Sequence, residues 1–204
     1  MRQPRQPSPV GSRRREAPDV RRDQILDAAV DVLLTHGLAT ATMADVADAA
    51  GIAKGTIYLY FESKTELLAA LRARHVNRFC AALSIALSGP GRAKAVTRID
   101  RFIQEFFDYS LGNRRLHRVL FHEAGFSEDD AFAGVRTLLA EFIAAGIGTG
   151  DFAPADTDLI TDYLLSGIHG ALVAALHASD HDAHHYTAGA KELSRRLLRP
   201  PLVG

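Results

Sequence analysis

The sequence predicts an all-α fold of about nine helices, with a three-helix N-terminal domain and a larger helical C-terminal domain. Apolar residues recur at spacings of three and four along most of the chain, and no sustained period-two alternation appears. Glycine and proline clusters separate these segments. The chain has 204 residues, 47% of them hydrophobic and 24% charged, a balance typical of one or two soluble globular domains. Disorder along the whole chain is therefore excluded.

The N-terminus is predicted to form a flexible basic arm over residues 1–19. Four prolines lie among Arg, Gln and Ser in this segment, a composition that buries too little apolar surface to offset the entropy of ordering. Seven arginines and two acidic residues give residues 1–22 a net charge of +5, whereas the whole chain is neutral. Arg13, Arg14 and Arg15 lie only a few residues before the first expected helix, within reach of an anionic surface beside it. A solvated tail is the alternative.

Helical periodicity starts after the arm and is divided by capping residues. The first helix is expected over about 20–36, where Gly37 supplies the left-handed residue that ends it. Thr42 begins a second, short helix with Asp45 as its reciprocal capping partner, and Gly51 closes that helix.

A third helix is expected over about 54–60, followed by a long fourth helix. The residues from Ser63 to Glu66 are typical of a capping box at the start of a helix. Gly89-Pro90-Gly91 is expected to end this long helix.

The second half of the chain carries five further helices. The fifth helix ends at Gly112-Asn113, and the sixth spans about 114–124. The seventh starts at Ser127, which is capped with Asp130, and runs into a linker at 146–150. The eighth starts at Asp156, and the ninth runs from about Asp182 to Pro200. The longest apolar stretch, Leu159 to Leu176, is interrupted by Asp162 and His169 and sits at the lower limit of membrane-spanning length. It is interpreted as a buried helix.

Residues 42–67, with the sequence TMADVADAAGIAKGTIYLYFESKTEL, predict a helix-turn-helix. Ala47 permits close crossing of the two short helices, Gly51 takes the turn, and Ile52 and Ile57 seal the pair.

The polar residues around the second short helix suit contact with DNA. Lys54 and Thr56 flank a glycine at an accessible helix N-terminus, and Tyr58 and Tyr60 offer hydroxyls to phosphate oxygens. Lys64 adds a charge at the start of the next helix. The alternative is a set of core aromatics and solvated lysines. Because two tyrosines two positions apart on a helix cannot both face one core, at least one is expected to be exposed.

This segment resembles the TetR family of transcriptional regulators. The similarity is nearly continuous from Arg22 to Leu71 and includes the Thr-starting helix, the Ala-Gly turn, the Lys-Gly-Thr helix ending in Tyr-x-Tyr-Phe, and the Ser-Lys pair. The resemblance implies a DNA-contact role for Thr42, Lys54, Gly55, Thr56, Tyr58, Tyr60 and Lys64. It also implies a DNA-binding domain over 20–80 and a ligand-binding and dimerisation domain over 81–204. Ala53 departs from the family pattern, in which a serine commonly caps the recognition helix.

Two further sites are expected in the C-terminal domain. The small residues Gly167, Gly170, Ala171 and Ala174 lie along one side of the eighth helix and predict a homodimer face; packing against the ninth helix is the alternative. Aromatic and polar side chains available to an effector pocket are Phe102, Phe106, His117, Phe121, Phe142, Tyr163 and His169. An ordinary core is the alternative for most of these aromatics.

No cofactor, metal site or catalytic constellation is expected. His177, His181, His184 and His185 resemble metal spacing, but a solvated connection between helices explains them, since no second cluster completes the coordination. The single cysteine, Cys80, cannot form an internal disulfide, which favours a reducing compartment such as the cytoplasm. An enzyme remains the rival class, although no Gly-x-Ser-x-Gly or His-Glu-x-x-His motif is present.

The sequence therefore predicts a cytoplasmic, homodimeric transcriptional regulator that binds double-stranded operator DNA and has no membrane association. It is interpreted as a repressor that a small-molecule effector releases from its operator, with an activator as the alternative within the same class. A nonspecific architectural DNA binder would need basic surface beyond the arm, whereas residues 23–204 carry a net charge of −5.

Overall fold

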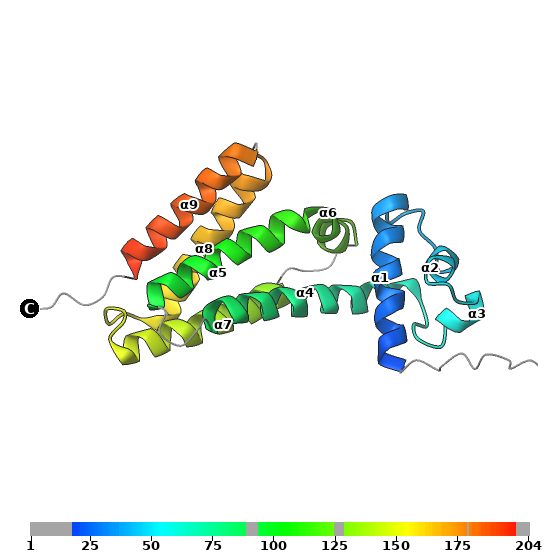
Figure 1. The fold of residues 1–204 in the computed structure, drawn as a ribbon, viewed down its shortest axis with the longest axis horizontal. Coiled ribbons are helices and arrows are strands. Elements are labelled where there is room, and N and C mark those ends of the chain that lie inside the picture. The colour runs from blue at the N-terminus through cyan, green and yellow to red at the C-terminus, as the bar shows by residue number, and fades with distance from the viewer. Residues whose placement is uncertain (1–17, 89–93, 125–128, 179, 199–204) are drawn as a thin grey trace, which may run out of the picture.

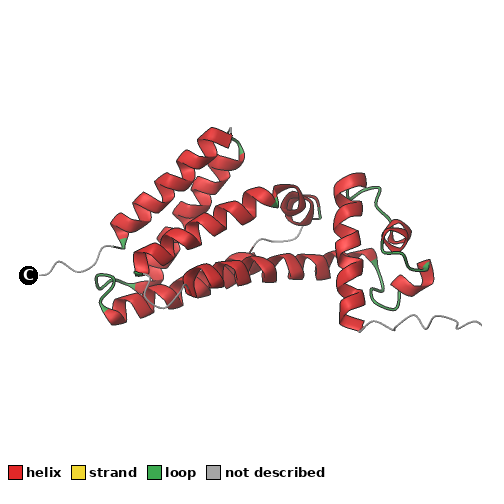
Figure 2. Ribbon diagram, viewed as in Figure 1, coloured by secondary structure: helices red, strands yellow, loops and turns green. Residues whose placement is uncertain are grey.

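The computed structural model describes residues 18–88, 94–124, 129–178 and 180–198. These residues form nine α-helices and one π-helical segment, with no strand among them (Figures 1 and 2). The all-α prediction is thereby confirmed. The basic arm up to residue 17, the helix end at Gly89-Pro90-Gly91, the Ser127 cap and the Pro200 stop lie outside the described residues.

The helices lie close to the predicted ranges. In chain order they are α1 (Pro18–His36), α2 (Met43–Ala49), α3 (Lys54–Ile57), α4 (Lys64–Ser88), α5 (Ala95–Gly112), α6 (Arg114–His117), the π-helix η1 (Arg118–Glu123), α7 (Asp129–Thr149), α8 (Thr157–Leu176) and α9 (Asp180–Leu197).

The chain folds around two separate hydrophobic cores, and α4 reaches both. The head consists of α1, α2, α3 and the start of α4, with α2 and α3 on the side of α1 that faces away from the rest of the molecule (Figure 1). Its core contains Ile25, Ala29, Val46, Ile57 and Phe61, together with Leu67, Leu68 and Leu71 of α4. Helices this short are marginal alone, so tertiary packing stabilises them.

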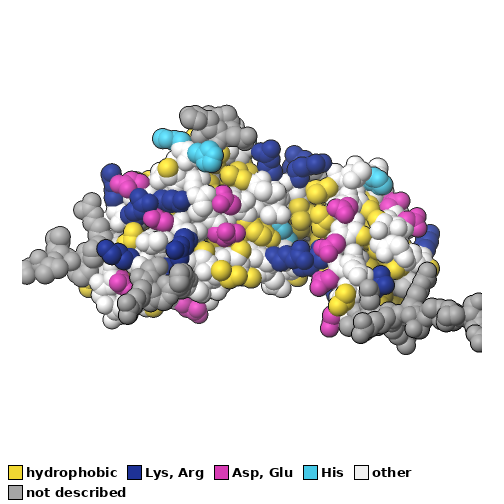
Figure 3. All heavy atoms as spheres, in the orientation of Figure 1, with side chains coloured by type: hydrophobic (Ala, Val, Ile, Leu, Met, Phe, Trp, Pro, Cys, Tyr) yellow, Lys and Arg dark blue, Asp and Glu magenta, His cyan; other side chains and the backbone are white. Residues whose placement is uncertain are grey.

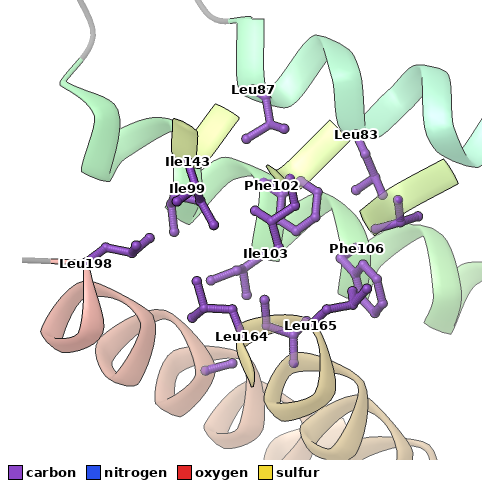
Figure 4. Close-up of a cluster of buried hydrophobic side chains, with 14 of the residues drawn as sticks. Leu83, Leu87, Ile99, Phe102, Ile103, Phe106, Ile143, Leu164, Leu165 and Leu198 are labelled. Atoms are coloured by element: carbon purple, nitrogen blue, oxygen red, sulfur yellow. The ribbon is translucent and has the colours of Figure 1, made fainter. Parts of the chain in front are cut away.

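The body core lies between α4, α5, α7, α8 and α9. Leu83 and Leu87 of α4 meet the α5 stripe of Ile99, Phe102, Ile103 and Phe106, while Ile143, Leu164, Leu165 and Leu198 close the cluster from the other helices (Figure 4). The helical spacing of the α5 apolar residues explains why one face of α5 is completely buried.

One segment of the second half packs into the head. Val119, Leu120 and Phe121 of η1 belong to the head core, although they follow α5 in the chain. The sequence predicted a single helix over 114–124, whereas the structure has one α-helical turn followed by a π-helix. π-Helical turns are rare and frequently occur at functional sites.

The predicted linker at 146–150 is wrong, because α7 continues through Gly146 and Gly148 to Thr149. Gly146 is required by packing: a Cβ at this position would lie 2.3 Å from Cδ2 of Phe152, whose ring is buried. The helix ends at Gly150, which has a φ of +79° that favours glycine.

The prediction of a buried eighth helix is wrong for one face. In α8, Leu164, Leu165 and Ile168 are buried, but Leu159 and Tyr163 are about 70% exposed. Both α7 and α8 are long and apolar enough to cross a membrane by length and composition. Each contributes buried residues to the body core, and an apolar helix in the core of a soluble protein has the same composition.

Candidate nucleic-acid interface and effector cavity

The first helix of the helix-turn-helix is held by the predicted capping box. The Thr42 main-chain N–H donates to Oδ2 of Asp45 at 2.8 Å, and the Asp45 N–H donates back to Oγ1 of Thr42 at 3.2 Å. The Thr42 hydroxyl also donates to the Asp45 carboxylate at 2.7 Å. These hydrogen bonds from Thr42 lower the pKa of Asp45 below its usual value. The Thr42 hydroxyl, a predicted DNA contact, therefore already holds the start of α2.

The turn and the crossing follow the sequence prediction. Gly51 has a φ of +65°, a conformation that favours glycine. Ala47 and Ile57 are completely buried where α2 and α3 meet, and Ile52 packs against the same core. Ala53 precedes α3 without a side-chain cap, as its methyl group requires.

The second helix of the helix-turn-helix, α3, is shorter than predicted. It ends at Ile57, and residues 58–60 form a turn rather than the last turn of a helix over 54–60. The turn directs Tyr58 outward with 45% of its surface exposed, while Tyr60 is half-buried against the head core. The expectation that at least one tyrosine is exposed is confirmed.

Sequence reasoning missed Leu59. This side chain is 82% exposed beside Tyr58, the largest exposure among the large hydrophobic side chains of the described residues. Leu59 lies between two tyrosines and does not follow the spacing of the core residues, and this pattern could have indicated that its side chain is exposed. Lys54, Gly55, Tyr58 and Leu59 thus form an exposed surface around α3, with Thr56 partly exposed among them.

Arg22 on α1 braces the turn after α3. Its guanidinium carbon lies 4.3 Å from the centre of the Phe61 ring, and Nη1 donates to the Tyr60 carbonyl at 3.4 Å. Phe61 is completely buried. The brace therefore ties α1 to the main chain that positions Tyr58.

Lys64 has a structural role that the sequence did not predict. Its ammonium donates to the main-chain carbonyls of Leu38 and Ala41, the latter at 2.7 Å. An ammonium group has three N–H donors, so these two bonds leave one for another acceptor. The predicted phosphate contact of Lys64 would have to use that remaining donor.

The small residues of α8 lie on a surface. Gly167 and Gly170 are exposed, and a Cβ on either would meet nothing within 4 Å. Ala171 and Ala174 are partly exposed beside them. Contacts within this chain therefore do not explain the glycines. The same face continues into a groove towards α9 that includes Tyr163, Leu193 and Leu197.

A cavity of about 390 Å³ lies in the body, lined by residues of α4, α5, α6, η1, α7 and α8. Four of the predicted pocket residues line it, namely Phe106, His117, Phe121 and His169. The other three predicted pocket residues do not line this cavity, so the prediction is wrong for them. Phe102 is completely buried in the core, Phe142 packs edge-on against Phe152, and Tyr163 is exposed on α8.

His75 of α4 lies at the inner wall of this cavity and was not predicted as a pocket residue. It is 8% exposed, and the Tyr109 hydroxyl donates to its carbonyl at 3.1 Å. Burial, followed by the nearby His117 and Arg78, lowers the pKa of His75 to about 4. The imidazole is therefore neutral at neutral pH.

Two of the histidines that the sequence placed in the α8–α9 connection lie elsewhere. His184 and His185 lie within α9 rather than in the predicted connection. In the part of the chain that the structure describes, no group of three His, Cys, Asp or Glu side chains could hold a metal ion.

A helix-turn-helix braced on a helical body is typical of a class of DNA-binding regulators. Comparisons with known proteins agree with this class. The family model "Bacterial regulatory proteins, tetR family" matches residues 25–71. The chain is 32% identical over 118 residues to the HTH-type transcriptional activator FasR of Mycolicibacterium smegmatis, covering 58% of this chain and 53% of FasR.

Two further proteins show the range of the similarity. The HTH-type transcriptional repressor LfrR of M. smegmatis is 48% identical over 56 residues, which is 28% of each chain. The structure of the fatty acid degradation regulator FadR from Bacillus halodurans has a TM-score of 0.66 at 26% identity, covering 91% of this chain and 97% of that one. The chain spans about half the length of FasR in the sequence comparison. Residues 25–71 thus match the DNA-binding domain of the TetR family, and the relatives named above are transcriptional regulators by name.

Proposed function

We propose that the protein binds operator DNA through α3 and the turn that follows it. The observation that carries this proposal is the exposed surface of Lys54, Gly55, Tyr58 and Leu59 on a helix-turn-helix whose opposite side is completely buried. Lys54 and Tyr58 contact phosphates, which fixes the register on the duplex. Thr56 reads a base edge, and Leu59 offers apolar contact to a thymine methyl group.

The proposed domains follow the two cores. The DNA-binding domain covers 20–80 and the ligand-binding and dimerisation domain covers 81–204, so that α4 passes from one to the other between Leu71 and Leu83. The packing of η1 into the head core supports a coupling between the two domains, because residues that follow α5 then help to hold the head.

The protein acts as a homodimer in this proposal. Two symmetry-related heads would contact half-sites about 34–36 Å apart, or a multiple of that distance. The exposed α8 face of Gly167, Gly170, Ala171 and Ala174, with Tyr163 and Leu159 beside it, supports a close helix contact with a second copy. Small residues allow helices to approach closely, and large apolar side chains on the same face favour its burial.

A small-molecule effector binds the body cavity and releases the DNA. Phe121 connects the two sites, since it lines the cavity and is also buried in the head core. His117 stacks on Phe121 with ring centres 4.5 Å apart. An effector shifts the equilibrium only if it binds the DNA-incompetent arrangement more tightly than the competent one. The regulator is cytoplasmic and represses its target promoter, with activation as the alternative.

Selection of bound fragments from a random DNA pool tests the proposal. The full chain should enrich one sequence with two related half-sites, and Thr56→Ala should change the enriched bases. Thr97→Ala is the matched control, because Thr97 is exposed on α5, away from the head. Enrichment of no common sequence, or an identical one from Thr56→Ala, would refute the reading surface. Deletion of the gene should raise target transcription for a repressor and lower it for an activator.

A further inference from the structure

The body cavity has an apolar interior. Phe79, Phe106, Phe132, Val135 and Leu172 line it from α4, α5, α7 and α8. Its volume of about 390 Å³ is at the lower end of the range for small-molecule sites, roughly 300–1,000 Å³. The cavity therefore fits a compact ligand with an apolar body.

The polar part of the lining is basic. Arg114, Arg115 and Arg118 of α6 and η1 contribute to it, and all three are exposed at the side of the body that faces the head. No aspartate or glutamate is among the lining residues that the structure describes. Figure 3 shows basic, acidic and apolar side chains together on the surface where the head joins the body.

This lining discriminates between ligand charges. Among the lining residues that the structure describes, an organic cation would meet guanidinium groups and no carboxylate, and burial of an unpaired charge is costly. A ligand carboxylate would instead find guanidinium groups, which bind carboxylates with paired, charge-assisted hydrogen bonds.

We propose that the effector is an organic carboxylate with an apolar body. The carboxylate lies at the mouth between Arg114 and Arg118, and the apolar body lies among Phe79, Phe106 and Phe132. This assignment deepens the proposed function and rests on it for the role of the ligand, although the binding itself can be measured without DNA.

Arg115 connects the carboxylate site to the head. Its Nη2 donates to the Leu34 carbonyl in the last turns of α1 at 2.9 Å. Since a carboxylate is a stronger acceptor than a main-chain carbonyl, a ligand at the mouth draws the Arg115 guanidinium away from Leu34. The bound anion thus weakens a contact that positions α1, and this gives it different affinities for the two arrangements of the head.

Calorimetric titration of the full-length protein with three ligands of equal length tests the charge assignment. Decanoate, decanol and decylammonium share an apolar chain and differ in charge. Decanoate should bind about tenfold or more tightly than decanol, the effect of one charge-assisted hydrogen bond, and decylammonium should bind most weakly. Phenylbutyrate serves as a second carboxylate with an aromatic body. Failure of both carboxylates to bind, or equal affinity for decanol and decanoate, would overturn the proposal.

Substitutions locate the site. Arg114→Gln and Arg118→Gln should each weaken decanoate binding by about tenfold and leave decanol binding unchanged. The control is Arg101→Gln, an exposed arginine on α5 that does not line the cavity. An Arg114→Gln/Arg118→Gln double variant that binds decanoate like the wild type would place the anion elsewhere.

The failure of this inference can be distinguished from failure of the proposed function. Carboxylate binding that depends on Arg114 and Arg118 in a protein that binds no DNA would refute only the operator proposal. Specific DNA binding without any carboxylate binding would refute only the effector class. Arg115→Ala should weaken decanoate binding, because the ligand loses a guanidinium that it would draw from Leu34. At saturating decanoate, the same variant should show a smaller ligand-induced loss of DNA binding than the wild type, and an unchanged response would refute the coupling through Leu34.

Discussion

The substitution Gly146→Ala should destabilise the protein although it replaces a helical glycine by the best helix former. The new Cβ would lie 2.3 and 2.4 Å from Cδ2 and Cε2 of Phe152. The Phe152 ring is 1% exposed, and the Phe152 N–H donates to the Gly146 carbonyl at 3.1 Å, so neither group can retreat freely. Overpacking of this kind costs about 1–3 kcal/mol, and the gain in helix propensity returns up to about 1 kcal/mol. We expect a net loss of up to about 2 kcal/mol.

Gly148→Ala is the matched control in the same turn of α7. A Cβ at Gly148 would meet nothing within 4 Å, so only the helix propensity remains and stability should rise by up to about 1 kcal/mol. Thermal unfolding at one protein concentration measures both variants. At roughly 2–4 °C per kcal/mol for a chain of this size, Gly146→Ala should lower Tm and Gly148→Ala should raise it slightly. Equal shifts would show that residues 146–149 do not pack as a helix against Phe152.

Three further predictions concern DNA binding and assembly. Arg22→Ala removes the cation–π contact with Phe61 and the hydrogen bond to the Tyr60 carbonyl, worth about 1 kcal/mol together. Operator affinity, measured by fluorescence anisotropy, should therefore fall about fivefold. An unchanged affinity would show that Arg22 does not position the DNA-binding turn. Gly170→Leu should raise the dimer dissociation constant about tenfold or more and weaken operator binding. If the variant sediments as a dimer and binds the operator with wild-type affinity, this α8 surface is not the dimer face. Deleting residues 1–15 should lower the slope of log affinity against log salt by roughly one to three units if the arm contacts phosphates, whereas parallel salt plots would leave it as a solvated tail.

The head was predictable from sequence because its signals are local. The Thr42–Asp45 capping box, the positive φ of Gly51 and the buried Ala47 each depend on a few neighbouring residues. The brace from Arg22 was not predictable, since Tyr60 lies 38 positions away in the chain. The same holds for Lys64, whose long stem reaches carbonyls that precede α2 rather than solvent.

The body was predictable as helices and less so as surfaces. Composition alone could not show that α8 leaves Leu159 and Tyr163 exposed, because burial of an apolar helix depends on where its neighbours pack. The pocket prediction found Phe106 and His117 but included Tyr163, which lies on the opposite side of the helix from the core. The glycines at 146–150 were interpreted as a linker, although Gly146 is required by the Phe152 ring.

Binding to duplexes with a varied half-site separation tests the central claim most directly. Two copies of the selected half-site are placed at separations that increase one base pair at a time, and the affinity of the full-length protein is measured for each duplex. A dimer that presents two α3 surfaces should show one affinity maximum near the natural separation and a second one turn of DNA further, with a steep loss half a turn away. An affinity that does not depend on separation, or that equals the affinity for unrelated DNA, would contradict the account.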